Sequence, residues 1–162
     1  MTRPRPRAVR LQLELCDRGR PRTPRAFVAR VVRTTLAFAR RPALPVSVLL
    51  TDDREIAALH AAHLGDASPT DVMSFALDGA AELVVSVQTA RRRARELGHA
   101  PRAELALYLV HGLLHQLGFD DRRARDRARM RVAEQQVLRR LRLAVSPVDA
   151  SAPASLRPRP RP

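Results

Sequence analysis

The stretch from Arg102 to Leu117 constrains the fold more than any other part of the chain. Drawn as a helix of about 3.6 residues per turn, it is apolar on most of its circumference. A helix that is apolar on most sides lies at the centre of a protein, where other elements cover it. The sequence therefore predicts a domain built around this helix. Its apolar positions are Leu105, Leu109, Val110, Leu113, Leu114 and Leu117.

Two histidines, His111 and His115, lie on the same predicted helix and are four residues apart. Residues four apart on a helix lie one above the other on the same face. Two polar rings on a buried helix are expected to be paired, because burying an unpaired polar group costs free energy. The spacing favours a metal ion shared by the two imidazoles. Two histidines satisfied by ordinary hydrogen bonds are the alternative.

The residues directly after the helix offer a third metal ligand. Gly118 can end the helix and turn the chain back, and the carboxylates of Asp120 and Asp121 follow it. Two imidazoles and a carboxylate, with one position left open, are typical of a catalytic zinc site. Iron, nickel and manganese are alternatives for the same ligands. On this reasoning either aspartate can be the third ligand.

Gly112 excludes one common chemistry for a helical histidine pair. Metalloproteases with the motif H-E-x-x-H carry a glutamate general base directly after the first histidine, and this chain has Gly112 there. A glycine beside the metal is instead expected to leave room for a bulky substrate.

Strand and helix patterns alternate along the rest of the chain. Residues 8–16 alternate between apolar and polar side chains, which is typical of a half-buried strand. Thr23 followed by Pro24 is a good helix start, and glycines mark several turns. Strands are expected at 8–16, 46–50, 72–77 and 82–87, and helices at 24–42, 52–63, 88–97, 102–117 and 121–143.

The charge of the chain points to an anionic partner. The formal net charge is +14, and all 30 basic residues are arginines. Six of these arginines belong to Arg-Pro runs at the two ends, at positions 3, 5, 7, 157, 159 and 161, so 14 − 6 leaves +8 for the rest. A domain this basic attracts phosphates, and nucleic acid is the first partner to consider. Anionic membrane surfaces and plain solubility are the alternatives.

The predicted helix at 88–97 carries four of these arginines. They are candidates for lining an RNA-backbone groove, and a solvated helix face is the alternative interpretation. The four are Arg91, Arg92, Arg93 and Arg95.

Cysteine usage and hydropathy indicate a cytoplasmic protein. The single cysteine, Cys16, excludes an internal disulfide, and no apolar run is long enough to span a membrane. The basic N-terminus lacks the apolar region of a secretory signal. We expect one domain at residues 8–145, with disordered tails at 1–7 and 146–162.

Several motifs resemble one known family. The segment LVHGLLHQLGFDD, Leu109 to Asp121, resembles the pattern H-G-x-L-H-x-x-G-Y-D-H of the YbeY family of bacterial metal-dependent endoribonucleases. SPTDVMSFAL at 68–77 is similar to the family's T-D-V-L-S-F element. Similar matches lie at 47–59 and 82–90, and Met130 and Glu134 match the family's last helix.

The resemblance implies an α+β fold, with a four-stranded mixed sheet, about five helices and the histidine-bearing helix at the centre. It also implies cleavage of single-stranded RNA in ribosomal RNA maturation and ribosome quality control, with the ribosomal subunit or its proteins as partners. His111 and His115 would be the catalytic residues, and with Asp121 they would hold one zinc ion per chain.

This chain departs from the family pattern at three places that matter for activity, one of which is Ala81-Glu82 in place of the Gly-Asp before the fourth strand. Asp121 stands where the family has its third metal-binding histidine, and Leu64 stands where it has an arginine that contacts phosphate. The alternative function is therefore a metal-stabilised ribosome-assembly factor that binds RNA or a ribosomal protein without cutting.

Overall fold

Four strands and five helices make up the part of the chain that the computed structural model describes, residues 10–65 and 70–145. The expected mixed sheet and helices are confirmed, whereas the tails predicted at 1–7 and 146–162 lie outside the described residues. The elements are β1 (Leu13–Asp17), α1 (Arg25–Phe38), β2 (Val46–Thr51), α2 (Asp53–Leu64), β3 (Val72–Leu77), β4 (Ala80–Ser86), α3 (Val87–Leu97), α4 (Pro101–Gln116) and α5 (Ala124–Leu141).

The sheet has the strand order β1-β2-β4-β3. β1, β2 and β4 run parallel, and β3 pairs antiparallel with β4 through a hairpin at Gly79, whose φ is 83°. Parallel neighbours need a crossover connection, and α1 provides it between β1 and β2. The antiparallel edge strand β3 is thereby placed against α4.

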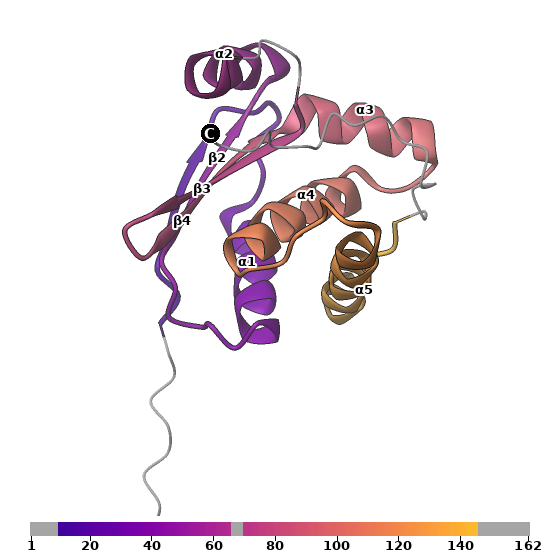
Figure 1. Cartoon of the computed structure of the whole chain (residues 1–162). Coiled ribbons are helices and arrows are strands. Elements are labelled where there is room, and N and C mark those ends of the chain that lie inside the picture. Colours follow the sequence, from indigo (N-terminus) through magenta and orange to yellow (C-terminus); the bar gives the residue numbers. More distant parts are fainter. Residues whose placement is uncertain (1–9, 66–69, 146–162) are drawn as a thin grey trace, which may run out of the picture.

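Helix α4 lies at the centre of the structure, as its apolar circumference predicts. It contacts the sheet through β3 and β4 and is covered on its other sides by α1, α3 and α5 (Figure 1). Leu109, Leu113 and Leu114 are at most 1% exposed, so the helix contributes to the core over most of its surface. A helix held on so many sides is a rigid platform for the polar side chains it carries.

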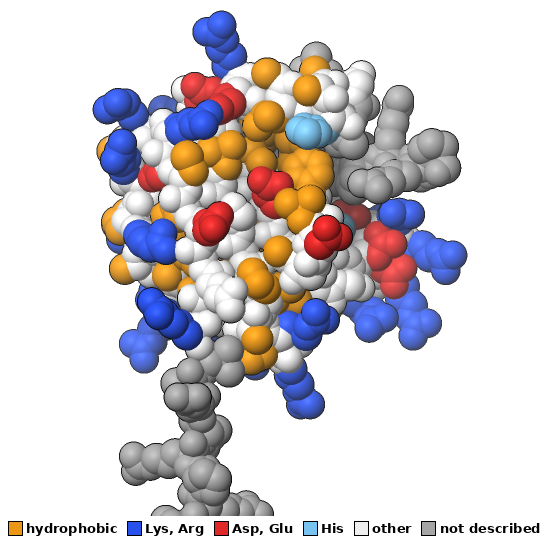
Figure 2. All heavy atoms as spheres, turned by 90° about the vertical axis from the view of Figure 1, so that its left-hand side faces the viewer, with side chains coloured by type: hydrophobic (Ala, Val, Ile, Leu, Met, Phe, Trp, Pro, Cys, Tyr) orange, Lys and Arg blue, Asp and Glu red, His pale blue; other side chains and the backbone are white. Residues whose placement is uncertain are grey.

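The opposite face of the sheet is covered mainly at one end. Helix α2 packs there, with Ile56 against Met73 and Val84 in a small second core. Figure 2 shows this side of the molecule: hydrophobic and acidic side chains gather at its centre, and arginines lie around the rim.

Gly112 lets α4 approach the sheet closely. A Cβ atom at this position would lie 2.9 Å from Val72 Cγ2 and 3.1 Å from Leu83 Cδ2. The absent side chain therefore makes room for the sheet, and the expectation that it makes room for a substrate is wrong.

Several predicted boundaries shift by a few residues because hydrogen bonds, not hydropathy, end the elements. β1 begins at Leu13 because its pairing with Val46 begins there. The last helix begins at Ala124 instead of 121, because the Asp120 carboxylate accepts hydrogen bonds from the backbone N–H groups of Asp121 and Arg122 and holds them in a turn. Ser86 ends β4 and caps α3 by accepting from Thr89 N.

Among the described residues, no helix has the length and apolar character needed to cross a membrane.

Candidate metal centre

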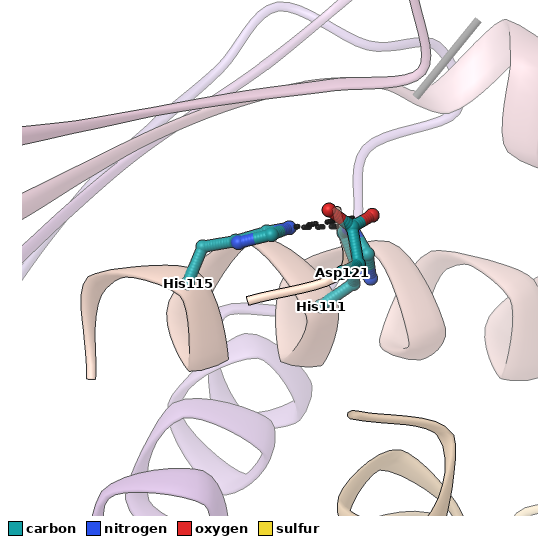
Figure 3. Close-up of side chains that lie close together, drawn as sticks. All are labelled: His111, His115 and Asp121. Carbon is teal, nitrogen blue, oxygen red and sulfur yellow. Dashed lines mark hydrogen bonds and ion pairs between the residues drawn. The ribbon is translucent and has the colours of Figure 1, made fainter. Parts of the chain in front are cut away.

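The two histidines of α4 face one another near the carboxyl end of the helix. The Nε2 atoms of His111 and His115 are 3.1 Å apart, and the ring planes meet at 82° (Figure 3). Two nitrogens bound to one tetrahedral zinc at about 2.0–2.1 Å would be about 3.3 Å apart. The imidazoles therefore already have the spacing that a shared ion requires.

The other nitrogen of each ring is held by the protein. His111 Nδ1 lies 2.6 Å from Glu134 Oε1 of α5, and His115 Nδ1 lies 3.1 Å from the carbonyl oxygen of Phe119. A carbonyl or carboxylate oxygen only accepts, so each Nδ1 carries the proton. When both rings are neutral, as metal binding requires, each keeps its Nε2 lone pair for a ligand. Metal-binding histidines are commonly oriented by such bonds to a carboxylate or a carbonyl.

Asp121 brings a carboxylate to the same point. Gly118 adopts a φ of 92° after the end of α4, which turns the chain back toward the histidines as its position predicts. Asp121 Oδ2 lies 3.8 Å from His115 Nε2, and one ligand atom from each of His111, His115 and Asp121 lies within 4.8 Å of the others. These three side chains can hold a metal ion.

Asp120, the other candidate for the third ligand, points elsewhere. Its carboxylate stabilises the turn by accepting from backbone N–H groups, and its side chain is 49% exposed. The structure therefore places Asp121, and not Asp120, beside the two imidazoles.

Electrostatics shift the pKa values of the two imidazoles in opposite directions. Burial disfavours the charged form of His111, but the hydrogen bond and negative charge of Glu134 outweigh it and raise the pKa of His111. Burial and the neighbouring charge of His111 lower the pKa of His115. The carboxylates around His111 thus favour a positive charge at the histidine pair. A bound cation would supply that charge.

Buried ionisable side chains lie near His111 along one side of α4. Glu104 is 2% exposed, and its carboxylate lies 2.5 Å from His99 Nε2. Burial, followed by the charges of Glu104 and Asp71, raises the pKa of Tyr108. Burial likewise raises the pKa of Asp71 to about 6.

Sequence reasoning assigned no role to Glu104 or Tyr108. One signal was available, since Glu104, Tyr108 and His111 recur at helical spacing and share a face of α4. Asp71 enters from the start of β3, and no local pattern connects it to α4.

The arginines of α3 are mostly engaged with other parts of the protein. Arg91 donates to the carbonyl oxygens of Arg20 and Pro21, the latter at 3.0 Å. Arg92 donates to Asp53 Oδ2 at 2.8 Å, and Arg93 donates to Glu96 Oε2 at 2.8 Å.

Arg92 and Arg95 are the exposed members of the four, and an RNA-binding role for this set stays a prediction. Leu64, at the family's arginine position, is the last residue of α2.

Together the fold and the site define an α+β protein with a helix-borne His/His/Asp cluster that can hold one metal ion. Comparison with known proteins gives the family. The family model described as endoribonuclease YbeY matches residues 20–142. The chain belongs to this family.

Curated relatives agree with the assignment. The chain is 37% identical over 129 residues to the endoribonuclease YbeY of Desulforamulus reducens, which covers 71% of this chain and 84% of that protein. It is 41% identical over 110 residues to that of Pelotomaculum thermopropionicum, covering 60% and 72% respectively. A solution structure of a Thermotoga maritima protein has the same fold, with a TM-score of 0.60, 22% identity and coverage of 81% of this chain and 92% of the other.

Proposed function

We propose that this chain is a metal-dependent endoribonuclease that cuts single-stranded RNA during ribosomal RNA maturation and ribosome quality control. One zinc ion per chain would bind to His111, His115 and Asp121. The family assignment supports RNA as the substrate class. The observation that carries the metal site is the pair of Nε2 atoms 3.1 Å apart, each with its Nδ1 held by a protein oxygen.

Each of these residues would have its own role at the site. His111 and His115 would hold the ion from one rigid helix, and Glu134 would fix the ring of His111. The carboxylate of Asp121 lowers the net charge of the site compared with a third histidine. When bound, the ion would supply Lewis acidity toward a phosphodiester or a water molecule. The open fourth position would be the place where substrate enters.

A second function is supported by a specific feature of the chain. Leu64 replaces the arginine with which the family contacts phosphate, and a leucine cannot stabilise negative charge on a cleaved phosphodiester. A metal-stabilised assembly factor that binds RNA or a ribosomal protein without cutting is therefore the alternative. In either case a cytoplasmic location and ribosomal partners remain predictions.

Cleavage of single-stranded ribosomal RNA fragments separates the two functions. The parent protein and a His115→Ala variant are each incubated with labelled fragments, with and without chelator. Cutting by the parent that disappears both with chelator and in the variant supports the nuclease. Binding without cutting by the zinc-loaded parent supports the assembly factor.

Metal content tests the site independently of activity. Elemental analysis of protein purified without an affinity tag is expected to find about one transition-metal ion per chain. Absence of metal, together with a melting temperature unchanged by added zinc, would reject the His111, His115 and Asp121 assignment.

A further inference from the structure

Three arginines converge on a cleft that shares no residue with the metal cluster. The cleft lies between the segment that leads into β1 and one face of α1, and its volume is about 340 Å³. Its lining residues are Arg10, Leu11, Leu13, Arg25, Ala29 and Arg33. No carboxylate side chain is among them.

The spacing of residues on α1 produces the cleft. Arg25, Ala29 and Arg33 are each four residues apart, so they lie in one row along the helix. The small side chain of Ala29 leaves a hollow between the two arginines. Arg25 is held over this hollow, because its Nη2 donates to the carbonyl oxygen of Leu13 at 2.6 Å.

Arg10 completes the charged rim from the other side. It is exposed and stands just before β1, opposite the row on α1. Leu11 and Leu13 add an apolar wall to the lining of the cleft. A guanidinium group binds phosphate oxygens through parallel N–H donors, and the apolar wall suits a sugar or a base. This combination fits a nucleotide unit better than a bare anion.

We propose that this cleft binds the phosphate backbone of single-stranded RNA, with phosphates on Arg10, Arg25 and Arg33. The inference rests on the proposed function, because it takes RNA to be the partner. It assigns the anchoring role to β1 and α1, where the cleft lining holds no carboxylate, whereas Arg92 and Arg93 of α3 are already paired with the carboxylates of Asp53 and Glu96.

A charge-matched control exists on the same molecule. A second cleft of about 440 Å³ is also flanked by two arginines, Arg125 and Arg129 of α5. Its other lining residues are mostly apolar and include Phe38, Phe119 and Val132. Removing either pair of arginines changes the net charge by the same amount, so unequal effects report the site and not the total charge.

The test measures binding of a fluorescent single-stranded RNA with 2′-O-methyl riboses, in chelator, by anisotropy over a range of salt concentrations. Each phosphate contact contributes about 0.7 to the slope of log K against log salt for single strands. The Arg25→Gln/Arg33→Gln variant is expected to lower the magnitude of the slope by about 1.4 and to weaken binding about tenfold. The Arg125→Gln/Arg129→Gln variant is expected to change both quantities by less than half as much.

A further variant guards against loss of folding. Arg10→Gln/Arg33→Gln leaves the hydrogen bond from Arg25 to Leu13 in place and should weaken binding to the same extent. Equal losses in the cleft and control variants, at unchanged melting temperatures, would overturn the proposal. So would an effect of the cleft variants on binding to phosphatidylglycerol vesicles but not to RNA.

The outcome is separable from that of the nuclease proposal. The probe is not cut under these conditions, so binding is read whether or not the protein is an enzyme. A parent that cuts RNA, with cleft variants that bind like the parent, refutes the cleft alone. Binding through the cleft without any cutting by the zinc-loaded protein refutes the nuclease alone.

Discussion

Replacement of Glu134 by glutamine tests whether α5 prepares His111 for metal binding. The Glu134 carboxylate accepts a hydrogen bond from His111 Nδ1 at 2.6 Å, and both side chains are nearly buried, with 13% and 12% exposed. Glutamine keeps the size and one acceptor oxygen but removes the charge. The imidazole then becomes a weaker ligand, because the negative partner that increases its basicity is gone.

The expected loss of zinc affinity follows from the kind of contact that is removed. Loss of an outer partner of a metal-binding histidine commonly lowers metal affinity about 10- to 100-fold, which corresponds to about 1.4–2.7 kcal/mol. The upper half of this range is expected, because the bond is short, charged and shielded from water. Glu134→Gln should therefore weaken zinc binding about 30- to 100-fold.

Competition with a chromophoric zinc chelator at constant pH measures this change. Glu96→Gln is the matched control, since Glu96 is an exposed acid on α3 that pairs with Arg93. The control should bind zinc like the parent. A zinc affinity for Glu134→Gln within about twofold of the parent, with an unchanged fold by circular dichroism, would refute the reasoning.

Three further perturbations have defined outcomes. Asp121→Asn should weaken zinc binding at least about tenfold, while Asp120→Asn should not; equal effects in the same competition assay would contradict the assignment of the third ligand. In chelator, Asp71→Asn should stabilise the protein above about pH 6 and not at about pH 4, because a carboxyl pKa raised to about 6 makes ionisation destabilising as pH rises between these values. Urea unfolding at both pH values checks this, and an equal difference at the two would count against it. Gly112→Val should cost about 1–3 kcal/mol through its clash with Val72 and lower the melting temperature by several degrees; a melting temperature like the parent's would mean that α4 and the sheet are not in close contact.

Local patterns were sufficient to predict the helices, the strands and the central place of α4, whereas the mixed sheet was expected from the family resemblance. The apolar circumference of α4 placed it at the centre, and β3 was predicted with its observed bounds, Val72–Leu77. These predictions succeed because helical and strand periods are properties of a few neighbouring residues. The boundaries that shifted, such as the start of α5, depend on individual hydrogen bonds that hydropathy does not report.

Contacts between distant segments could not be predicted in the same way. Glu134 lies 23 residues from His111, and the pair forms only because α5 packs beside α4. The cleft at Arg10 and Arg33 likewise requires that the segment before β1 passes beside α1. Neither arrangement corresponds to a residue spacing that could be recognised in the sequence.

The sequence by itself determined that His111 and His115 share a face, since four residues make about one helical turn wherever the helix lies. It also determined that Gly118 would turn the chain. Only the tertiary structure decided that Asp121 reaches the imidazoles while Asp120 stabilises the turn, and that Gly112 faces the sheet. Such choices depend on backbone dihedral angles after the helix and on which elements pack against each of its sides. Those are fixed when the whole core assembles.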